Sequence, residues 1–132
     1  ILIDVDHFKA YNDTYGHPQG DLVLKGLGDC LRECTECSEG LPARYGGEEF
    51  VVLLPTSGTQ EAMRIAESLR RRVAERSFPC APVTASLGVA TFGHGCGDAE
   101  SLIELADRAL YESKSRGRNR VTHANSLDRR AA

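Results

Sequence analysis

Two adjacent glycines followed by two adjacent acids constrain this chain more than any other feature of its sequence. The stretch Arg44–Phe50 reads Arg-Tyr-Gly-Gly-Glu-Glu-Phe and lies between apolar runs at residues 41–45 and 50–54. Glycines between two such runs predict a β-hairpin, because glycine permits the positive φ that tight hairpin turns require. The glycines also expose bare backbone beside Glu48 and Glu49, which suits a nucleotide triphosphate carried with Mg²⁺. The alternative is a plain surface hairpin with solvated carboxylates.

The beginning of the chain supplies a second pair of acids. Residues 1–6 are an apolar run in which Asp4 and Asp6 lie two residues apart, so on a strand they share a face. A rigid strand that fixes two hard oxygen ligands suits a divalent metal ion. Asp6 has an alternative role as the N-cap of a helix that begins at His7. We therefore interpret Asp4 as a metal ligand and Asp6 as partly structural.

The hydrophobic periodicity of the rest of the chain alternates between helix and strand. We expect helices at residues 7–13, 18–34, 59–76 and 98–117, and strands at residues 1–6, 41–46, 49–54, 83–89 and 120–123. Thr59 and Asp98 are the predicted N-caps and Gly117 is the predicted stop of the last helix. Residues 93–97 are expected to be a flexible connection and residues 125–132 a frayed polar tail. This order predicts an α/β (α+β) domain with a mixed sheet flanked by helices.

Charge and hydropathy exclude several classes of partner. The formal net charge is −3, so we expect no nucleic-acid partner. No apolar run approaches the roughly 20 residues of a membrane-spanning helix, and no secretory signal is visible, so we expect a cytoplasmic domain without membrane contact. The chain begins inside a predicted strand, which indicates a fragment of a longer protein.

The five cysteines include a cluster with the spacing C-x₃-C-x₂-C, formed by Cys30, Cys34 and Cys37. Radical-SAM enzymes use this spacing for an iron–sulfur cluster, but this chain is too short for their barrel. Cys30 and Cys34 are four residues apart on an apolar stripe, which favours packing as small hydrophobic side chains. We expect reduced cysteines, as is usual in the cytoplasm.

Four separated blocks of the sequence resemble the GGDEF family, the diguanylate cyclases. The family opens with a pattern close to D-x-D-x-F-K-x-x-N-D-x-x-G-H-x-x-G-D, and residues 4–21 follow it from Asp4 to Asp21. The central motif corresponds to residues 46–50, and the closing signature corresponds to residues 106–111 and 114–119. The resemblance extends to about Val121.

The resemblance implies a central, mostly antiparallel sheet of about five strands flanked by helices, similar to the palm of nucleotide cyclases and polymerases. Residues 1–124 would form the GGDEF domain, here with a GGEEF motif. Family members also carry an upstream segment with a D-x-L-T-G-L-x-N-R signature, which this chain lacks. An upstream sensory or receiver domain is the expected regulatory partner.

The reaction implied by the resemblance joins two GTP molecules into cyclic di-GMP and releases two pyrophosphates, with two domains facing each other in a homodimer. The implied cofactor is Mg²⁺ (or Mn²⁺), held by Asp4, Glu48 and the carbonyl group of Val5. Glu48, Glu49 and Lys9 are the implied catalytic residues. The implied GTP-binding residues are His7, Phe8, Asn12, Asp21, Gly46, Gly47, Lys114 and Arg118.

Several of these residues have ordinary structural alternatives. The alternative for Lys9 is a lysine on the solvent-exposed surface of a helix. Lys114 and Arg118 are four residues apart near a helix end, so both can point at one spot, but cations there also interact favourably with the helix C-terminus. Asp21 can accept hydrogen bonds from N1–H and the exocyclic amine of guanine, which adenine cannot donate. Its alternative role is to stabilise the first turn of its helix.

One departure from the family concerns product inhibition. Many members carry an R-x-x-D pair shortly before the glycines as an inhibitory site, but Cys37 and Gly40 stand at these positions here. We therefore expect no inhibitory site. Two other functions remain open: a catalytically silent GTP-binding regulatory module, and a dimeric signalling adaptor.

Overall fold

A computed structural model describes residues 1–93 and 97–128 of the chain. Its elements are β1 (Leu2–Val5), α1 (Phe8–Tyr15), α2 (His17–Thr35), β2 (Leu41–Gly46), β3 (Glu49–Leu53), α3 (Thr59–Glu75), β4 (Ala85–Val89), α4 (Ala99–Ser115), β5 (Val121–His123) and α5 (Asn125–Asp128). All the predicted helices and strands are present within a few residues of their expected bounds. In the described part of the chain, no helix combines the length and apolar character needed to span a membrane.

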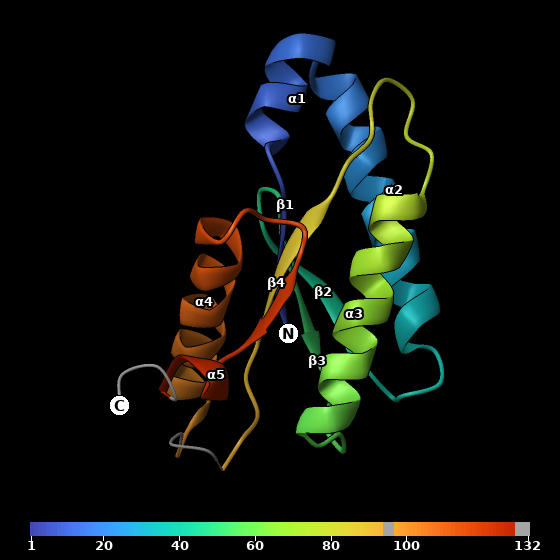
Figure 1. The fold of residues 1–132 in the computed structure, drawn as a ribbon. Helices are drawn as coiled ribbons and strands as arrows, with labels where there is room; N and C mark the ends of the chain where they lie inside the picture. The colour runs from blue at the N-terminus through green and yellow to red at the C-terminus, as the bar shows by residue number, and fades with distance from the viewer. Residues whose placement is uncertain (94–96, 129–132) are drawn as a thin grey trace.

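The five strands form one sheet in the order β2-β3-β1-β4-β5 (Figure 1). β1 lies in the centre and pairs antiparallel with both β3 and β4, and β2 pairs antiparallel with β3. Only β4 and β5 are parallel. The expected five-stranded, mostly antiparallel fold is therefore confirmed.

Helices cover the two faces of the sheet unequally. α2 and α3 lie on one face, and α4 lies on the other (Figure 1). The side chains of β1 alternate between these faces, because successive strand residues point in opposite directions. Ile3 and Val5 join the core beneath α2 and α3, whereas Leu2 packs with Ala106 and Leu110 of α4. Asp4 follows Leu2 on the α4 face, which directs its carboxylate toward the C-terminal end of that helix.

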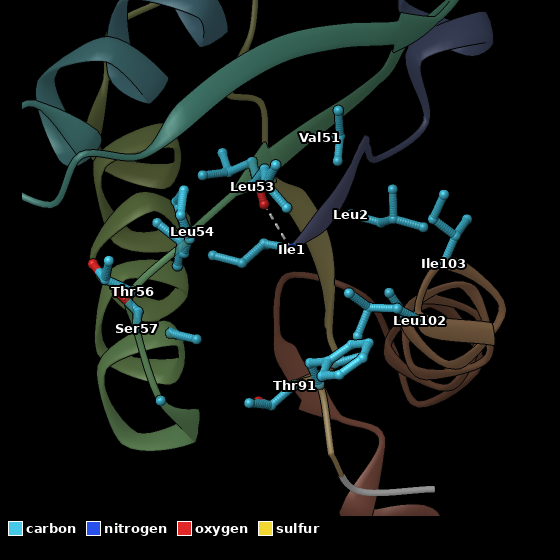
Figure 2. A pocket seen from close by; sticks show the side chains of 17 residues that line it. Ile1, Leu2, Val51, Leu53, Leu54, Thr56, Ser57, Thr91, Leu102 and Ile103 are labelled. Carbon is cyan, nitrogen blue, oxygen red and sulfur yellow. Dashed lines mark hydrogen bonds between the residues drawn. The ribbon is translucent and has the colours of Figure 1, made fainter. Parts of the chain in front are cut away.

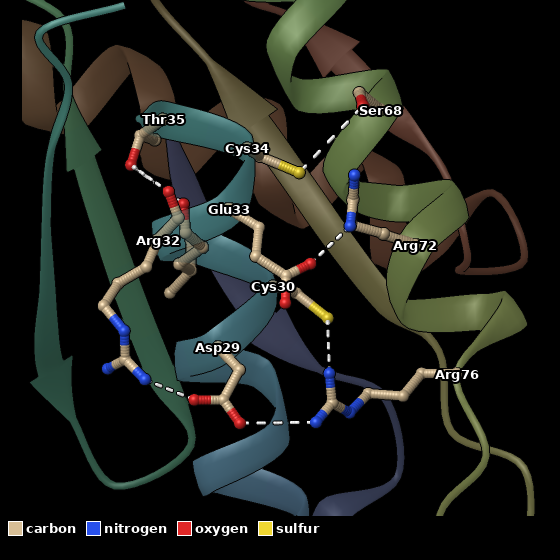
Figure 3. A network of polar contacts seen from close by, with 10 residues as sticks. Asp29, Cys30, Arg32, Glu33, Cys34, Thr35, Ser68, Arg72 and Arg76 are labelled. Carbon is tan, nitrogen blue, oxygen red and sulfur yellow. Dashed lines mark hydrogen bonds and ion pairs between the residues drawn. The ribbon is translucent and has the colours of Figure 1, made fainter. Parts of the chain in front are cut away.

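α2 and α3 are joined by a seam of polar contacts (Figure 3). Arg76 lies 3.3 Å from a carboxylate oxygen of Asp29 and donates to Cys30 Sγ at 3.8 Å, and Arg72 pairs with Glu33. Cys30 is buried in the core and Cys34 packs against that core, as predicted for small hydrophobic side chains. Among the described residues, no three histidine, cysteine or acidic side chains form a group that could hold a metal ion.

The ends of α4 agree with the sequence. The side chain of Asp98 accepts a hydrogen bond from the backbone N–H of Ser101 at 2.8 Å, as an N-cap does. At the other end, Gly117 has a φ of 107°, and its N–H bonds the carbonyl of Lys114 while that of Arg118 bonds the carbonyl of Ser113. This pair of bonds is a Schellman motif, so Gly117 is the predicted stop.

Two predictions were wrong, one about the start of α3 and one about the C-terminal end of the chain. Thr59 is not an N-cap: Gly58 has that position, and the Thr59 hydroxyl donates to Thr91 Oγ1 at 3.1 Å instead. The polar residues 125–128 form the short helix α5 rather than a frayed tail. Residues 94–96 of the expected connection and residues 129–132 lie outside the described part of the chain.

Candidate active site

The hairpin turn lies where the predicted strand bounds, 41–46 and 49–54, put it. β2 ends at Gly46 and β3 begins at Glu49, so Gly47 and Glu48 form the connection. Neither Gly46 nor Gly47 has a positive φ, so the predicted reason for glycine in this turn was wrong. A Cβ on Gly47 would meet no atom within 4 Å, which leaves open space over the backbone at the turn. A bulky ligand can therefore approach the main chain here.

A pocket of about 430 Å³ lies between this turn and the first two helices. It is lined by Phe8, Lys9, Asn12, Asp13, His17, Asp21, Leu24, Arg44, Gly47 and Glu48. Six of the residues expected to act on GTP are among them, contributed by segments about 25 to 40 positions apart in sequence. His7 is not: it is exposed with a φ of 57° and lines a smaller hollow on the other side of α1.

Asp4 lies in a strongly acidic neighbourhood. It is 9% exposed, and its Cα is paired with that of Glu49 across the sheet. Burial raises the pKa of Asp4, the ammonium group of Lys114 opposes this, and the charges of Glu48 and Glu49 raise the pKa further. Three carboxylates therefore act on one small region, where a cation is stabilised.

Lys114 supplies a cation at this place. Its Nζ lies 2.8 Å from a carboxylate oxygen of Asp4, with a third of the lysine side chain exposed. The backbone N–H of Val5 donates to the carbonyl of Glu48 at 3.3 Å, which holds the end of β1 against the turn. The hard oxygen atoms that suit Mg²⁺ at this position are the carboxylates of Asp4 and Glu48 and the carbonyl group of Val5. In the described part of the nucleotide-free chain, Asp4, Glu48 and Glu49 are not gathered into a group of three side chains that could hold a metal ion.

Lys114 and Arg118 are not arranged as the sequence suggested. α4 ends at Ser115, and Gly117 and Arg118 both have positive φ, so the helical i, i+4 relation is broken before Arg118. Lys114 reaches Asp4, whereas Arg118 is exposed on the loop that follows the helix. Neither residue lines the pocket beside Asn12.

Asp6 does not cap α1, so that alternative was wrong. The N-cap of α1 is His7, which makes no side-chain capping bond. The carboxylate of Asp6 is instead bound by the hydroxyl groups of Thr84 and Ser86 and by the backbone N–H of Asn119. The interpretation of Asp6 as a structural residue is consistent with these bonds.

Arg44 is a feature of the site that the sequence reasoning missed. Its guanidinium donates to the carbonyl of Gly47 from Nε at 3.0 Å and from Nη2 at 2.7 Å. The two bonds fasten the turn from the neighbouring strand. The signal available in the sequence was an arginine three residues before the second glycine, a distance that a hairpin brings within reach.

Asn12 and Gly20 are in direct contact in the pocket wall. The amide oxygen of Asn12 is buried and has no hydrogen-bond partner in the described structure. A Cβ on Gly20 would lie 1.8 Å from that oxygen and 3.1 Å from Phe8 Cζ. The side chain of Asn12 therefore occupies its position only because residue 20 has no side chain.

Replacing Gly20 with Ala is expected to displace Asn12 and weaken GTP binding about tenfold, since one polar contact to a ligand contributes roughly 1.4 kcal/mol. Isothermal titration with GTP measures this effect. The control is Gly28→Ala, also in α2, where an added Cβ meets no atom within 4 Å. Equal affinities for the two variants would contradict a role of Asn12 in nucleotide binding.

A second pocket, of about 560 Å³, is mainly apolar. Leu2, Val51, Leu53, Leu102 and Ile103 are among the side chains that line it (Figure 2). It contains none of the residues expected to bind nucleotide or metal. The pocket at the hairpin turn, rather than this apolar one, gathers residues that the sequence analysis expected to act on GTP.

Comparison with known proteins identifies relatives over nearly the whole chain. The family model for the diguanylate cyclase GGDEF domain matches residues 1–120. Diguanylate cyclase A of Treponema denticola is 45% identical over 126 residues, with 92% of this chain and 34% of that protein covered. Response regulator PleD of Caulobacter vibrioides is 44% identical over 128 residues, with 92% and 28% covered. The chain thus spans about a third of the length of these relatives.

Solved structures agree in sequence and in fold. The active GGEEF domain of a diguanylate cyclase from Vibrio cholerae superposes with a TM-score of 0.88 at 34% identity, covering 93% of this chain and 80% of that one. The GGDEF domain of DgcB from Caulobacter crescentus, in complex with c-di-GMP, gives a TM-score of 0.87 at 36% identity, covering 94% and 75%. On this family match, these identities and the site geometry, the chain belongs to the GGDEF domain family of diguanylate cyclases.

Proposed function

We propose that this domain is a diguanylate cyclase that condenses two GTP molecules into cyclic di-GMP with release of two pyrophosphates. The observation that carries the proposal is the polar pocket, in which Asn12 and Asp21 lie in one cavity with Gly47 and Glu48. Two residues suited to recognise the base and a turn that phosphate groups can approach lie in the same cavity. This arrangement fits one nucleotide. Because each product molecule needs two GTP molecules, we infer a homodimer in which two such pockets face each other.

Each residue has a chemical task in this proposal. Asp21 accepts from N1–H and the amine of guanine, and Asn12, whose amide oxygen is turned toward Gly20 in the nucleotide-free chain, is the second residue proposed to contact the base. The open backbone at Gly47, with Gly46 beside it, admits the phosphates. Lys9 and Arg118 stabilise the phosphate charge, and Phe8 forms the apolar wall of the base pocket.

Asp4, Glu48 and the carbonyl group of Val5 would hold Mg²⁺ (or Mn²⁺), which supplies charge neutralisation at the phosphate oxygens. Glu49 lies opposite Asp4 in the sheet and is the candidate to accept the proton of the attacking 3′-hydroxyl. Lys114 pairs with Asp4 in the nucleotide-free chain and is free to turn toward the terminal phosphates, since its side chain is a third exposed.

The ion pair between Lys114 and Asp4 favours one alternative, a GTP-binding regulatory module without turnover. A lysine that stayed on Asp4 would compete with a divalent cation for the same carboxylate. The retention of both glycines and both acids in the central motif favours the enzyme.

The test is to join the domain to a dimerising segment, incubate it with GTP and Mg²⁺ or Mn²⁺, and measure cyclic di-GMP by chromatography. GTP binding is measured separately by calorimetry. Product formation supports the cyclase. Binding without product supports the regulatory module, and no binding contradicts both.

We also propose the context in which the domain acts. Residues 1–124 are assigned to the cyclase unit, which acts in the cytoplasm, where GTP is available. A sensory or receiver domain upstream would control dimerisation. Neither nucleic acid nor membrane is a proposed partner.

Product inhibition through residues 37–40 is not expected. Cys37 provides no guanidinium group, and Gly40 provides no carboxylate. A Cβ on Gly40 would lie 2.9 Å from both Thr35 Cβ and Leu54 Cδ2, so the local packing also disfavours an aspartate there. Cyclic di-GMP added to the reaction should therefore not lower the initial rate of its synthesis by binding at residues 37–40. Tight product binding that maps to residues 37–40 would contradict this prediction.

A further inference from the structure

The carboxylate of Asp6 is buried and fully engaged. The residue is 7% exposed, and its side chain accepts from Ser86 Oγ at 2.7 Å, from Thr84 Oγ1 at 2.7 Å and from the backbone N–H of Asn119 at 3.0 Å. Two of these donors lie on or beside β4, and the third lies in the loop after α4. A buried charge with three donors fixes the segments that provide them.

The loop that Asp6 holds has an unusual backbone. Gly117, Arg118 and Asn119 have consecutive positive φ values of 107°, 63° and 45°. Left-handed backbone is unfavourable for residues with a Cβ, so Arg118 and Asn119 keep this conformation only if other contacts hold it. The bond from the Asn119 N–H to Asp6 is one such contact.

A second contact holds Asn119, and it comes from α3, which covers the opposite face of the sheet from α4. Arg70 of α3 donates from Nη1 to the side-chain oxygen of Asn119 at 2.8 Å. Arg70 is itself oriented by two bonds to the carboxylate of Glu67, at 3.0 Å and 2.8 Å. Asn119 is thus fixed through its backbone by Asp6 and through its side chain by Arg70, which leaves the adjacent Arg118 on a rigid support.

Asp4 and Asp6 therefore hold consecutive parts of the same region. Asp4 binds Lys114 in the last turn of α4, and Asp6 binds the loop that carries Arg118. We propose that Asp6 is a positioning residue: it fixes the left-handed loop after α4 so that the Arg118 guanidinium is presented to the polyphosphate of GTP. This inference rests on the proposed binding of GTP, and it deepens that proposal by adding a residue that touches no substrate.

The variant Asp6→Ala tests the proposal, because it removes both carboxylate oxygens and leaves the Asn119 N–H without its acceptor. In the conservative variant Asp6→Asn, the amide oxygen can take the place of Oδ2 and the amide nitrogen can donate to the Ser86 hydroxyl, so the bond from Asn119 can be kept. We expect GTP dissociation constants about tenfold higher for Asp6→Ala than for the wild type or Asp6→Asn, and faster amide exchange at Asn119 without nucleotide. In an Arg118→Ala background, Asp6→Ala should change the dissociation constant less than about twofold, because the presented group is already absent.

The control variant is Thr35→Val. Thr35 is 4% exposed and donates to the carbonyl of Leu31 at 2.8 Å, so its loss also removes a buried hydrogen bond, but in α2. It should lower the melting temperature and leave GTP affinity unchanged in both backgrounds.

The outcomes separate this inference from the proposed function. If the wild type binds no GTP, the proposed function fails and this inference fails with it. If the wild type binds GTP, two results overturn the inference alone: an equal loss of affinity from Asp6→Ala with and without Arg118, or unchanged affinity and unchanged exchange at Asn119 in Asp6→Ala.

Discussion

Replacing Asp4 with Asn should lower cyclic di-GMP formation by roughly 1,000-fold, the largest effect on activity that we expect from one substitution. An amide has the shape of the carboxylate but no charge, so it cannot hold a divalent cation between β1 and the hairpin turn. The neighbouring Glu48 and Glu49 would remain, yet the site would lose the most buried of these three acids. The measurement is the initial rate of product formation at saturating GTP and Mg²⁺.

The fold should tolerate this substitution. The pKa of Asp4 is raised in the folded chain, chiefly by burial, so its charged form opposes folding once the pH exceeds the ordinary aspartate range. The stability of Asp4→Asn relative to the wild type should therefore increase as the pH rises through the raised pKa. Asp107→Asn, an exposed aspartate on α4, is the matched control and should keep wild-type activity. Wild-type turnover by Asp4→Asn would contradict the proposed metal site.

Gly88→Ala should destabilise the domain by about 3 kcal/mol or more, which lowers the melting temperature by roughly 10 °C for a chain of this size. A Cβ at this position of β4 would lie 2.1 Å from the carbonyl oxygen of Ala106 and 2.3 Å from the backbone nitrogen of Leu110. These atoms belong to the main chain of α4 and cannot move away by changing a rotamer. Thermal unfolding followed by circular dichroism measures the effect.

Gly28→Ala makes the same chemical change in open space and serves again as the control. It lies inside α2, where alanine is favoured over glycine by about 1 kcal/mol, so this variant should unfold at a slightly higher temperature than the wild type. Similar melting temperatures for the two variants would contradict the close packing of α4 on β4.

The order of helices and strands was predictable because each element carries a local signal. The alternation of Val83, Ala85 and Leu87 with polar residues indicated a strand, and the structure has β4 at Ala85–Val89. Asp98 and Gly117 marked the two ends of α4 through capping preferences that act over a few residues. Thr59 carried a similar signal, but its hydroxyl group found a tertiary partner in Thr91.

Part of the lining of the candidate site was predictable, and its arrangement was less so. Asn12, Asp21 and Glu48 were selected by motif, and the fold brings them to one pocket. The relation between Lys114 and Arg118 was wrong, because it assumed that a helix continued past residue 115. Arg44 was missed because its partner is a backbone carbonyl, so the only signal for this bond was the spacing of the arginine from the second glycine within a hairpin.

Residue types and their short spacings were enough to infer the family, the order of the elements and the identities of the acids. The contact of Lys114 with Asp4, and that of Asp6 with a loop 113 residues away in the chain, arise only from folding. The pairing of β1 with β4 and the end of α4 create both contacts. A hydrogen bond between residues far apart in the sequence forms only when folding has placed both chain segments. No local pattern in the sequence indicates such a bond.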